Sequence, residues 1–213
     1  MRRMLKVLQY ALVLIILFQS YATYSYAKDP VNQAKRLYSR MALVPLANGP
    51  NEVDIDGDGE KDLVFVGRWE NYNAHSSNEF AFYAHYRDQY LPELKWYVVP
   101  FFDKRGALQI DLRTQEGADC ILRDIRILSP ASENNRPVTV IVGTRDFGKS
   151  FADSASVRFI VYELMRGGVP GFPPLYFQEK QTIKVKTKYC DINAAFLKEL
   201  GINDYRNAVK PRN

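Results

Sequence analysis

Seven short apolar runs between residues 63 and 189 restrict the fold more than any other feature of the sequence. They are rich in Val, Ile, Phe and Tyr, and residues such as Gly, Pro, Asn and Asp separate them. Short runs of β-branched and aromatic residues between turn-forming residues are typical of β-strands. The runs cover residues 63–67, 79–86, 96–101, 121–128, 138–143, 157–164 and 182–189. The sequence therefore predicts a mainly β interior.

The last of these runs shows the clearest alternation. Its two sides are Ile183, Val185 and Thr187 on one, and Lys184, Lys186 and Lys188 on the other. Successive side chains of a strand point to opposite faces of a sheet, so this pattern predicts one buried and one solvated face. A sheet with one buried and one solvent-exposed face is typical of antiparallel pairing.

Helical spacing is found mainly near the two ends, over residues 31–41 and 191–200. Asp191 can cap the second of these helices and Gly201 can end it. No repeat of about 20 to 50 residues is visible, which argues against a propeller or a solenoid. We therefore expect a mainly β (α+β) fold: an antiparallel sheet or sandwich with short peripheral N- and C-terminal helices.

The first 27 residues have the composition of an export signal. Arg2, Arg3 and Lys6 precede an apolar run over residues 10–18, and small residues around Ala27 provide a cleavage site. The apolar run is shorter than the roughly 20 residues that cross a bilayer, so we expect a cleaved signal peptide and no permanent membrane anchor. Residues 28–213 are then a single β-rich domain in the periplasm, long enough to bury its own core.

Removal of the leader changes the electrostatic interpretation. The formal net charge falls from +5 to +2, because three basic residues and no acidic ones leave with residues 1–27. A nearly neutral chain does not carry the clustered positive charge that nucleic-acid binding requires. We expect no nucleic-acid partner.

Cys120 and Cys190 are the only cysteines. An even count in an exported protein favours a disulfide. The alternative is two buried, apolar thiols. Neither a CxxC redox motif nor a Cys-His zinc cluster is present, so the cysteines indicate a structural role.

The segment over residues 54–62 has acidic residues at nearly every second position. The predicted calcium ligands are the side chains of Asp54, Asp56, Asp58 and Asp62 and the backbone carbonyl of Glu60. Gly59, at the sixth position, permits the sharp turn that such loops make. The gathered carboxylates repel one another unless a cation neutralises them. We therefore expect a structural calcium ion, the alternative being an acidic hairpin turn without metal.

This loop is not an EF-hand. Phe65 occupies the twelfth position, where an EF-hand has a bidentate glutamate, and the segment that follows is a predicted strand. The loop alone resembles the Asp-rich calcium loops of extracellular β proteins such as integrin propellers.

A phosphate-loop pattern occurs at residues 143–150, Gly-Thr-Arg-Asp-Phe-Gly-Lys-Ser. Nucleotide binding requires a helix after this loop, so that its N-terminal amides face the phosphates. The residues after Ser150 instead favour a strand. We expect a loop between two strands and no nucleotide.

Recognisable hydrolytic motifs are scarce. The sequence contains no nucleophile elbow and only two histidines, His75 in a polar stretch and His85 in a predicted strand. We expect His75 to lie in a loop and His85 to be packed.

Three segments carry a resemblance to a known family: residues 53–67, which contain the Asp-rich loop, residues 71–76 and residues 189–200. Together they resemble the CarG-type carbapenem intrinsic-resistance family, across most of the predicted mature chain. This resemblance implies a periplasmic protein, not a β-lactamase and not an enzyme, that protects against a carbapenem by sequestering the drug or shielding its target. The implied partner is a carbapenem or a cell-wall transpeptidase. The alternatives are an envelope hydrolase with a dispersed active site and a calcium-stabilised protein-binding module.

Overall fold

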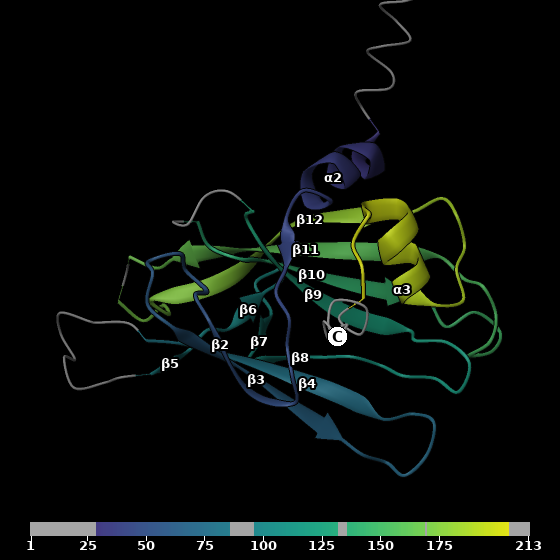
Figure 1. Ribbon diagram of the computed structural model, residues 1–213, viewed down its shortest axis with the longest axis horizontal. Helices are drawn as coiled ribbons and strands as arrows, with labels where there is room; N and C mark the ends of the chain where they lie inside the picture. The colour runs from purple at the N-terminus through teal and green to yellow at the C-terminus, as the bar shows by residue number, and fades with distance from the viewer. Residues whose placement is uncertain (1–28, 86–95, 132–135, 169, 205–213) are drawn as a thin grey trace, which may run out of the picture.

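Two β-sheets stacked face to face form the body of the protein, with helices on one outer side (Figure 1). The computed structural model describes residues 29–85, 96–131, 136–168 and 170–204. The predicted signal peptide lies outside the described residues. No described helix has the length and apolar character needed to span a membrane.

The larger sheet has seven strands in the order β1-β9-β10-β11-β12-β6-β7. Its strands are β1 (Ala42–Leu43), β9 (Arg123–Ser129), β10 (Thr139–Arg145), β11 (Val157–Arg166), β12 (Leu175–Lys184), β6 (Phe101–Phe102) and β7 (Leu108–Gln109). All pairs are antiparallel except β12 with β6. A bulge in β11 interrupts the register with β12 between Val161 and Tyr162.

The smaller sheet has five strands in the order β2-β3-β4-β5, with β8 also paired to β4. Its strands are β2 (Gly49–Val53), β3 (Asp62–Trp69), β4 (Ser77–Ala84), β5 (Tyr97–Val98) and β8 (Asp111–Arg113). Every pair in it is antiparallel. The predicted mainly β, antiparallel architecture is confirmed.

Apolar side chains from both sheets meet between them. Fully buried aromatic rings occupy the centre, where Phe101 stacks on Phe177 with centroids 4.7 Å apart and Phe82 meets both edge-on. Edge-to-face and offset contacts of this kind add to the free energy gained from burial. This layer joins the two sheets into one core.

The other face of the seven-stranded sheet is covered by helices, as Figure 1 shows. They are α2 (Pro30–Tyr38), α3 (Ile192–Ala195) and a π-helical turn, η1 (Phe196–Leu200). Gly143 of β10 lets η1 approach closely, because a Cβ atom at this position would lie only 2.6 Å from the ring of Phe196. Both predicted segments are helical, although the first helix ends at Tyr38 and the second is π-helical from Phe196 onward.

The predicted ends of the second helix are also confirmed. The carboxylate of Asp191 accepts a hydrogen bond from the Asn193 amide at 2.7 Å, and Gly201 ends the helix at φ 70°. A left-handed residue after a helix is most easily a glycine, which has no Cβ to clash.

Two predicted strands differ from the structure. The run over residues 96–101 divides into β5 and β6, which belong to different sheets. The run over residues 182–189 is a strand only to Lys184, and β12 instead begins at Leu175. Ile183 and Val185 are buried as expected, but Thr187 is exposed. Past Lys184, the Val185 amide still donates to the Val157 carbonyl at 3.0 Å, and an isolated bridge joins Ala155 and Tyr189. Alternating side chains therefore continue beyond the end of β12.

Candidate functional site

The Asp-rich segment is the hairpin loop between β2 and β3. The two carboxylate oxygens of Asp54 accept hydrogen bonds from the amides of Gly57 at 2.7 Å and Gly59 at 3.0 Å. Both glycines have positive φ, 78° and 89°. Gly57 also lies against the backbone of Arg136, at a distance that leaves no room for a side chain. The local sequence thus determines a tight loop around the Asp54 carboxylate.

Three of the predicted ligands come together in this loop. One carboxylate oxygen from each of Asp54, Asp56 and Asp58 lies within 4.8 Å of the others. Oxygens at this spacing are what a hard cation binds. The group could therefore hold a metal ion.

The other two predicted ligands have different surroundings. Asp62 is buried, and its two oxygens accept hydrogen bonds from the amides of Ile55 at 2.9 Å and His85 at 2.8 Å. The side chain of Glu60 lies beside His85, with Oε2 3.3 Å from Nδ1. Asp62 thus ties the loop to the end of β4, and it is not one of the three clustered carboxylates.

Asp56 also has a protein cation as its partner. Its Oδ2 lies 2.7 Å from Nη2 of Arg166, at the end of β11. Burial, followed by the charge of Asp58, raises the pKa of the Asp56 carboxyl, and Arg166 partly offsets this. Burial also raises the pKa of Asp62. The loop is therefore a place where negative charge is costly and a cation is favoured.

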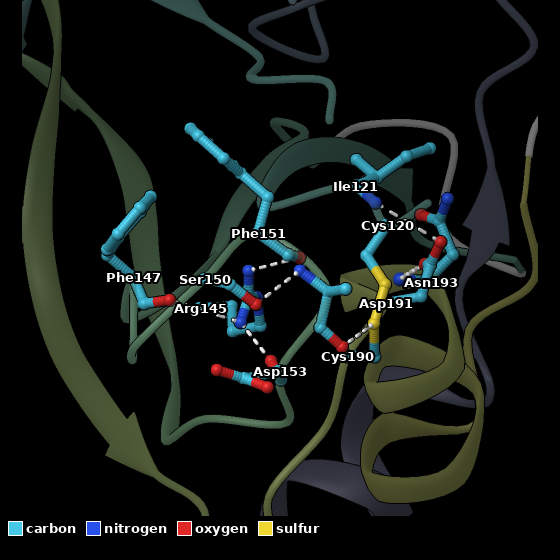
Figure 2. Close-up of a disulfide and its surroundings, with 11 residues drawn as sticks. Cys120, Ile121, Arg145, Phe147, Ser150, Phe151, Asp153, Cys190, Asp191 and Asn193 are labelled. Atoms are coloured by element: carbon cyan, nitrogen blue, oxygen red, sulfur yellow. Dashed lines mark hydrogen bonds between the residues drawn. A yellow bond between two sulfur atoms is a disulfide. The ribbon is translucent and has the colours of Figure 1, made fainter. Parts of the chain in front are cut away.

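The predicted disulfide is present between Cys120 and Cys190 (Figure 2). It joins the segment before β9 to the residue before the α3 cap, with Cα atoms 5.7 Å apart. Next to it, the Asp191 carboxylate accepts a hydrogen bond from the Ile121 amide at 3.3 Å. The bridge fixes the start of α3 against the segment that leads into β9.

The phosphate-loop pattern lies partly in β10 and partly in the loop that follows. Arg145, buried at 3% exposure, donates hydrogen bonds to the carbonyls of Phe147, Phe151 and Asp153, the middle one at 2.8 Å. Figure 2 shows this guanidinium enclosed by the loop. No helix follows Ser150 within the described residues 136–168, and β11 begins at Val157. The predicted loop between two strands is confirmed.

Two cavities open on the described part of the protein. One, of about 450 Å³, lies beside the loop after β10, with Asp146, Lys149 and Lys188 among its lining residues. The other, of about 360 Å³, has apolar walls that include Val66 and Phe80.

The polar groups of the 360 Å³ cavity are largely engaged in ion pairs. Arg68 makes a two-pronged contact with Glu116, at 3.1 and 3.2 Å, and an ion pair with Glu70 at 2.9 Å. Across the cavity, Asp124 is held by the fully buried Arg126 at 2.7 Å. Carboxylates thus outnumber the one arginine, Arg68, in this lining.

The two histidines make different contacts from one another. His75 lies in a loop, as predicted, and its ring is 4.7 Å from that of Phe151. His85 follows β4 and does not lie in it, and with a 36% exposed side chain it is less packed than predicted. Its ring contacts Trp96 and Glu60.

Arg126, Arg145 and Arg166 were not found by sequence reasoning. Arg126 and Arg166 contact residues that are distant in the sequence. Arg145 donates to carbonyls of a loop whose path depends on the fold. No motif marks an arginine for such a role. The one available sequence signal was the position of Arg126 between Ile125 and Ile127, inside an apolar run.

Comparison with known proteins identifies the family. A family model described as "Carbapenem resistance protein CarG-like" matches residues 46–198. The chain belongs to the CarG-like family. This match covers both sheets, the Asp-rich loop and both cysteines of the disulfide, so the resemblance expected from the sequence is confirmed.

A solved structure with the CarG fold is also similar. The structure described as "Crystal structure of CarG" is 19% identical, with a TM-score of 0.59 over 74% of this chain and 94% of that chain. At this identity the likeness concerns the fold. No curated protein sequence gives a significant match.

Proposed function

We propose that this chain is an exported protein that lowers susceptibility to a carbapenem without hydrolysing it. Its membership of a family described by carbapenem resistance carries this proposal. Protection would act by sequestering the drug or by shielding its target, a cell-wall transpeptidase. The N-terminal export signal would deliver the protein to the periplasm, where those targets work.

The surroundings of the histidines support a non-hydrolytic mechanism. A nucleophile is usually activated by a base within hydrogen-bond reach, itself oriented by a third group. The His75 ring lies at a tilt against that of Phe151, and His85 lies beside Glu60. The hydroxyl of Ser76, the next residue in the chain after His75, donates to Glu70 at 2.6 Å. These contacts suit a scaffold better than a charge-relay arrangement.

A structural calcium ion at Asp54, Asp56 and Asp58 is part of the proposal. The convergence of their carboxylates supports it, since a divalent cation would offset the repulsion between Asp56 and Asp58. Asp62 and the Glu60 carbonyl were also expected as ligands, but the Asp62 oxygens already accept hydrogen bonds from the Ile55 and His85 amides, so the proposal rests on the three clustered carboxylates. The ion would stiffen the β2–β3 hairpin without supplying an open coordination position for chemistry.

The direct test expresses the full-length gene in a susceptible host beside a version that lacks residues 1–27. Full-length protein is expected to raise the inhibitory concentration of a simple carbapenem, and the leaderless version is not. Mass spectrometry of the drug after incubation with purified protein should show intact carbapenem. No rise with the exported form would refute protection, whereas catalytic loss of the drug would favour the alternative of a dispersed hydrolase site.

A further inference from the structure

A row of basic residues crosses one end of the seven-stranded sheet. Arg123 of β9 is paired with Thr144 of β10, Thr144 with Arg158 of β11, and Arg158 with Lys184 of β12. Residues paired directly across antiparallel strands place their side chains on the same face. The alternate positions Ile125, Val142 and Ile160 belong to the core between the sheets, so this row extends the same face.

The end of this face is accessible. Arg123 and Thr144 are half-buried, the Arg158 side chain is 42% exposed and Lys184 is exposed. Neighbouring strands lie about 4.8 Å apart, so the Cα atoms of Arg123 and Arg158 are about 10 Å apart, with the Thr144 hydroxyl between them. At this spacing two guanidiniums can approach one small anionic group from either side of Thr144.

Arg123 lacks a counterion in the described parts of the chain. None of those residues accepts a hydrogen bond from its guanidinium, and its Nε is buried without a partner. Burial, and the nearby charge of Arg158, lower the pKa of the Arg123 guanidinium. A half-buried guanidinium beside a like charge is costly unless an acceptor neutralises it. Of the two arginines, only Arg158 forms an ion pair with a carboxylate in the described structure. Its partner is the exposed Asp146, at 2.6 Å.

We infer that Arg123, Thr144 and Arg158 form a binding site for the carboxylate of a small organic anion, with Lys184 adding positive charge at its side. Arginine forks match carboxylate geometry, and a threonine hydroxyl can donate to the same group. The 360 Å³ cavity is a poorer carboxylate site, because its Arg68 already holds Glu116 and Glu70. Asp146 is then a competitor that the ligand displaces from Arg158.

This inference rests on the proposed function in one respect: it identifies the carbapenem carboxylate as the group that would be held during sequestration. Carbapenems carry a carboxylate on the bicyclic ring, and a protein that sequesters them needs a cationic partner for it. The site itself requires only the carboxylate. Benzoate, a carboxylate that shares no ring system with the drug, therefore tests the site separately.

The experiment titrates the full mature protein with a carbapenem whose only charge is its carboxylate, with the methyl ester of that drug, and with benzoate. Calorimetry gives the dissociation constants, and NMR follows the Thr144 amide. Arg123→Gln and Arg158→Gln should each weaken acid binding roughly tenfold or more, the usual effect of losing a charge-assisted hydrogen bond. Asp146→Asn should strengthen it several-fold. The ester should bind wild-type protein as weakly as the acid binds Arg123→Gln.

Arg36→Gln is the matched control, since it removes the same charge from an exposed residue of α2, on the helix-covered side of the sheet. Its affinity should equal that of wild type. Equal affinities for acid and ester, or unchanged binding in both Arg123→Gln and Arg158→Gln, would overturn the site. Binding of neither carboxylate would do the same. If benzoate binds and the two arginine variants weaken that binding, but the carbapenem does not bind, the carboxylate site would be supported and sequestration refuted.

If Arg123→Gln fails to fold, two measurements remain. The NMR shift of the Thr144 amide needs only wild-type protein, and Arg158→Gln changes a partly exposed residue. A carboxylate that shifts distant amides but not Thr144 would place binding elsewhere and overturn the inference.

Discussion

The guanidinium of Arg166 forms an ion pair with the carboxylate of Asp56, 110 residues earlier in the chain, at 2.7 Å. Asp56 belongs to the β2–β3 hairpin of the smaller sheet, and Arg166 ends β11 of the larger one. The pair therefore connects the two sheets at the Asp-rich loop. It also places a permanent positive charge beside the group that could hold a metal ion.

Removal of the Arg166 charge should strengthen calcium binding. Arg166→Gln is expected to lower the calcium dissociation constant several-fold, because the cation no longer competes for Asp56. Asp56→Ala should abolish the rise in melting temperature that calcium produces in wild type. Lys180→Gln, which removes a charge from an exposed ion pair on β12, is the control and should leave calcium affinity unchanged. Identical wild-type melting curves in calcium and chelator would show that the loop is only a turn.

The pH dependence of stability should report the buried Asp56 carboxylate in calcium-free buffer. Burial and Asp58 raise its pKa above the ordinary value of 3.8, so the folded state binds this proton more tightly than the unfolded chain does. Its contribution to stability therefore falls as pH rises from about 4 through the raised pKa, and is constant above it. Asp56→Asn lacks this fall.

The measurement is the difference in melting temperature between Asp56→Asn and wild type, which should become more favourable to the variant between about pH 4 and about pH 7. A difference that moves the other way would mean that Arg166 outweighs burial at this carboxylate.

Loss of the disulfide should cost substantial stability. The Cys120–Cys190 bridge spans 70 residues, and on the chain-entropy model a loop of this length contributes about 4 kcal/mol. The double variant Cys120→Ser/Cys190→Ser should lose a similar free energy of unfolding in denaturant titrations under oxidising conditions. Reductant should destabilise wild type and leave the double variant unchanged. Non-reducing mass spectrometry of exported protein should find no free thiol, and two free thiols would contradict the bridge.

The fully buried Arg126 should be among the most sensitive positions in the larger sheet. Its guanidinium donates to Asp124 at 2.7 Å and to the Asn203 carbonyl at 3.0 Å, and lies 4.7 Å from the ring centroid of Phe196. Arg126→Ala should cost about 3 to 5 kcal/mol, since it leaves the Asp124 carboxylate without its charge partner.

The double variant Arg126→Leu/Asp124→Leu is the companion test for this pair. It should recover part of the loss, because neither charge is left buried alone. Equal destabilisation of the double variant and Arg126→Ala in denaturant titrations would show that packing around Phe196, and not charge, dominates.

Several elements could be predicted because their signals are local. Asp191 and Gly201 mark the ends of one helix, since capping and left-handed backbone depend on a few neighbouring residues. The loop after β10 was also predictable, because strand-forming residues follow Ser150. The position predicted for β12 was too late in the chain, since the alternation of buried and exposed side chains continues past Lys184, where the strand ends. The alternation of apolar and polar side chains indicates which residues are buried. The ends of the strand are defined by its pairing with β11.

The sequence by itself determined the mainly β class, the sharp turn of the Asp-rich loop and the cysteine pairing, because each depends on neighbouring residues or on residue counts. The family followed from the resemblance of three segments to known members. Only the tertiary structure decided that Arg166 reaches Asp56 and that Arg123 and Arg158 stand on either side of Thr144. Those relationships depend on strand order and register, and a shift of one residue would turn each side chain to the opposite face. The chemistry of the loop and of the basic row therefore follows from pairings between distant segments, which no local pattern encodes.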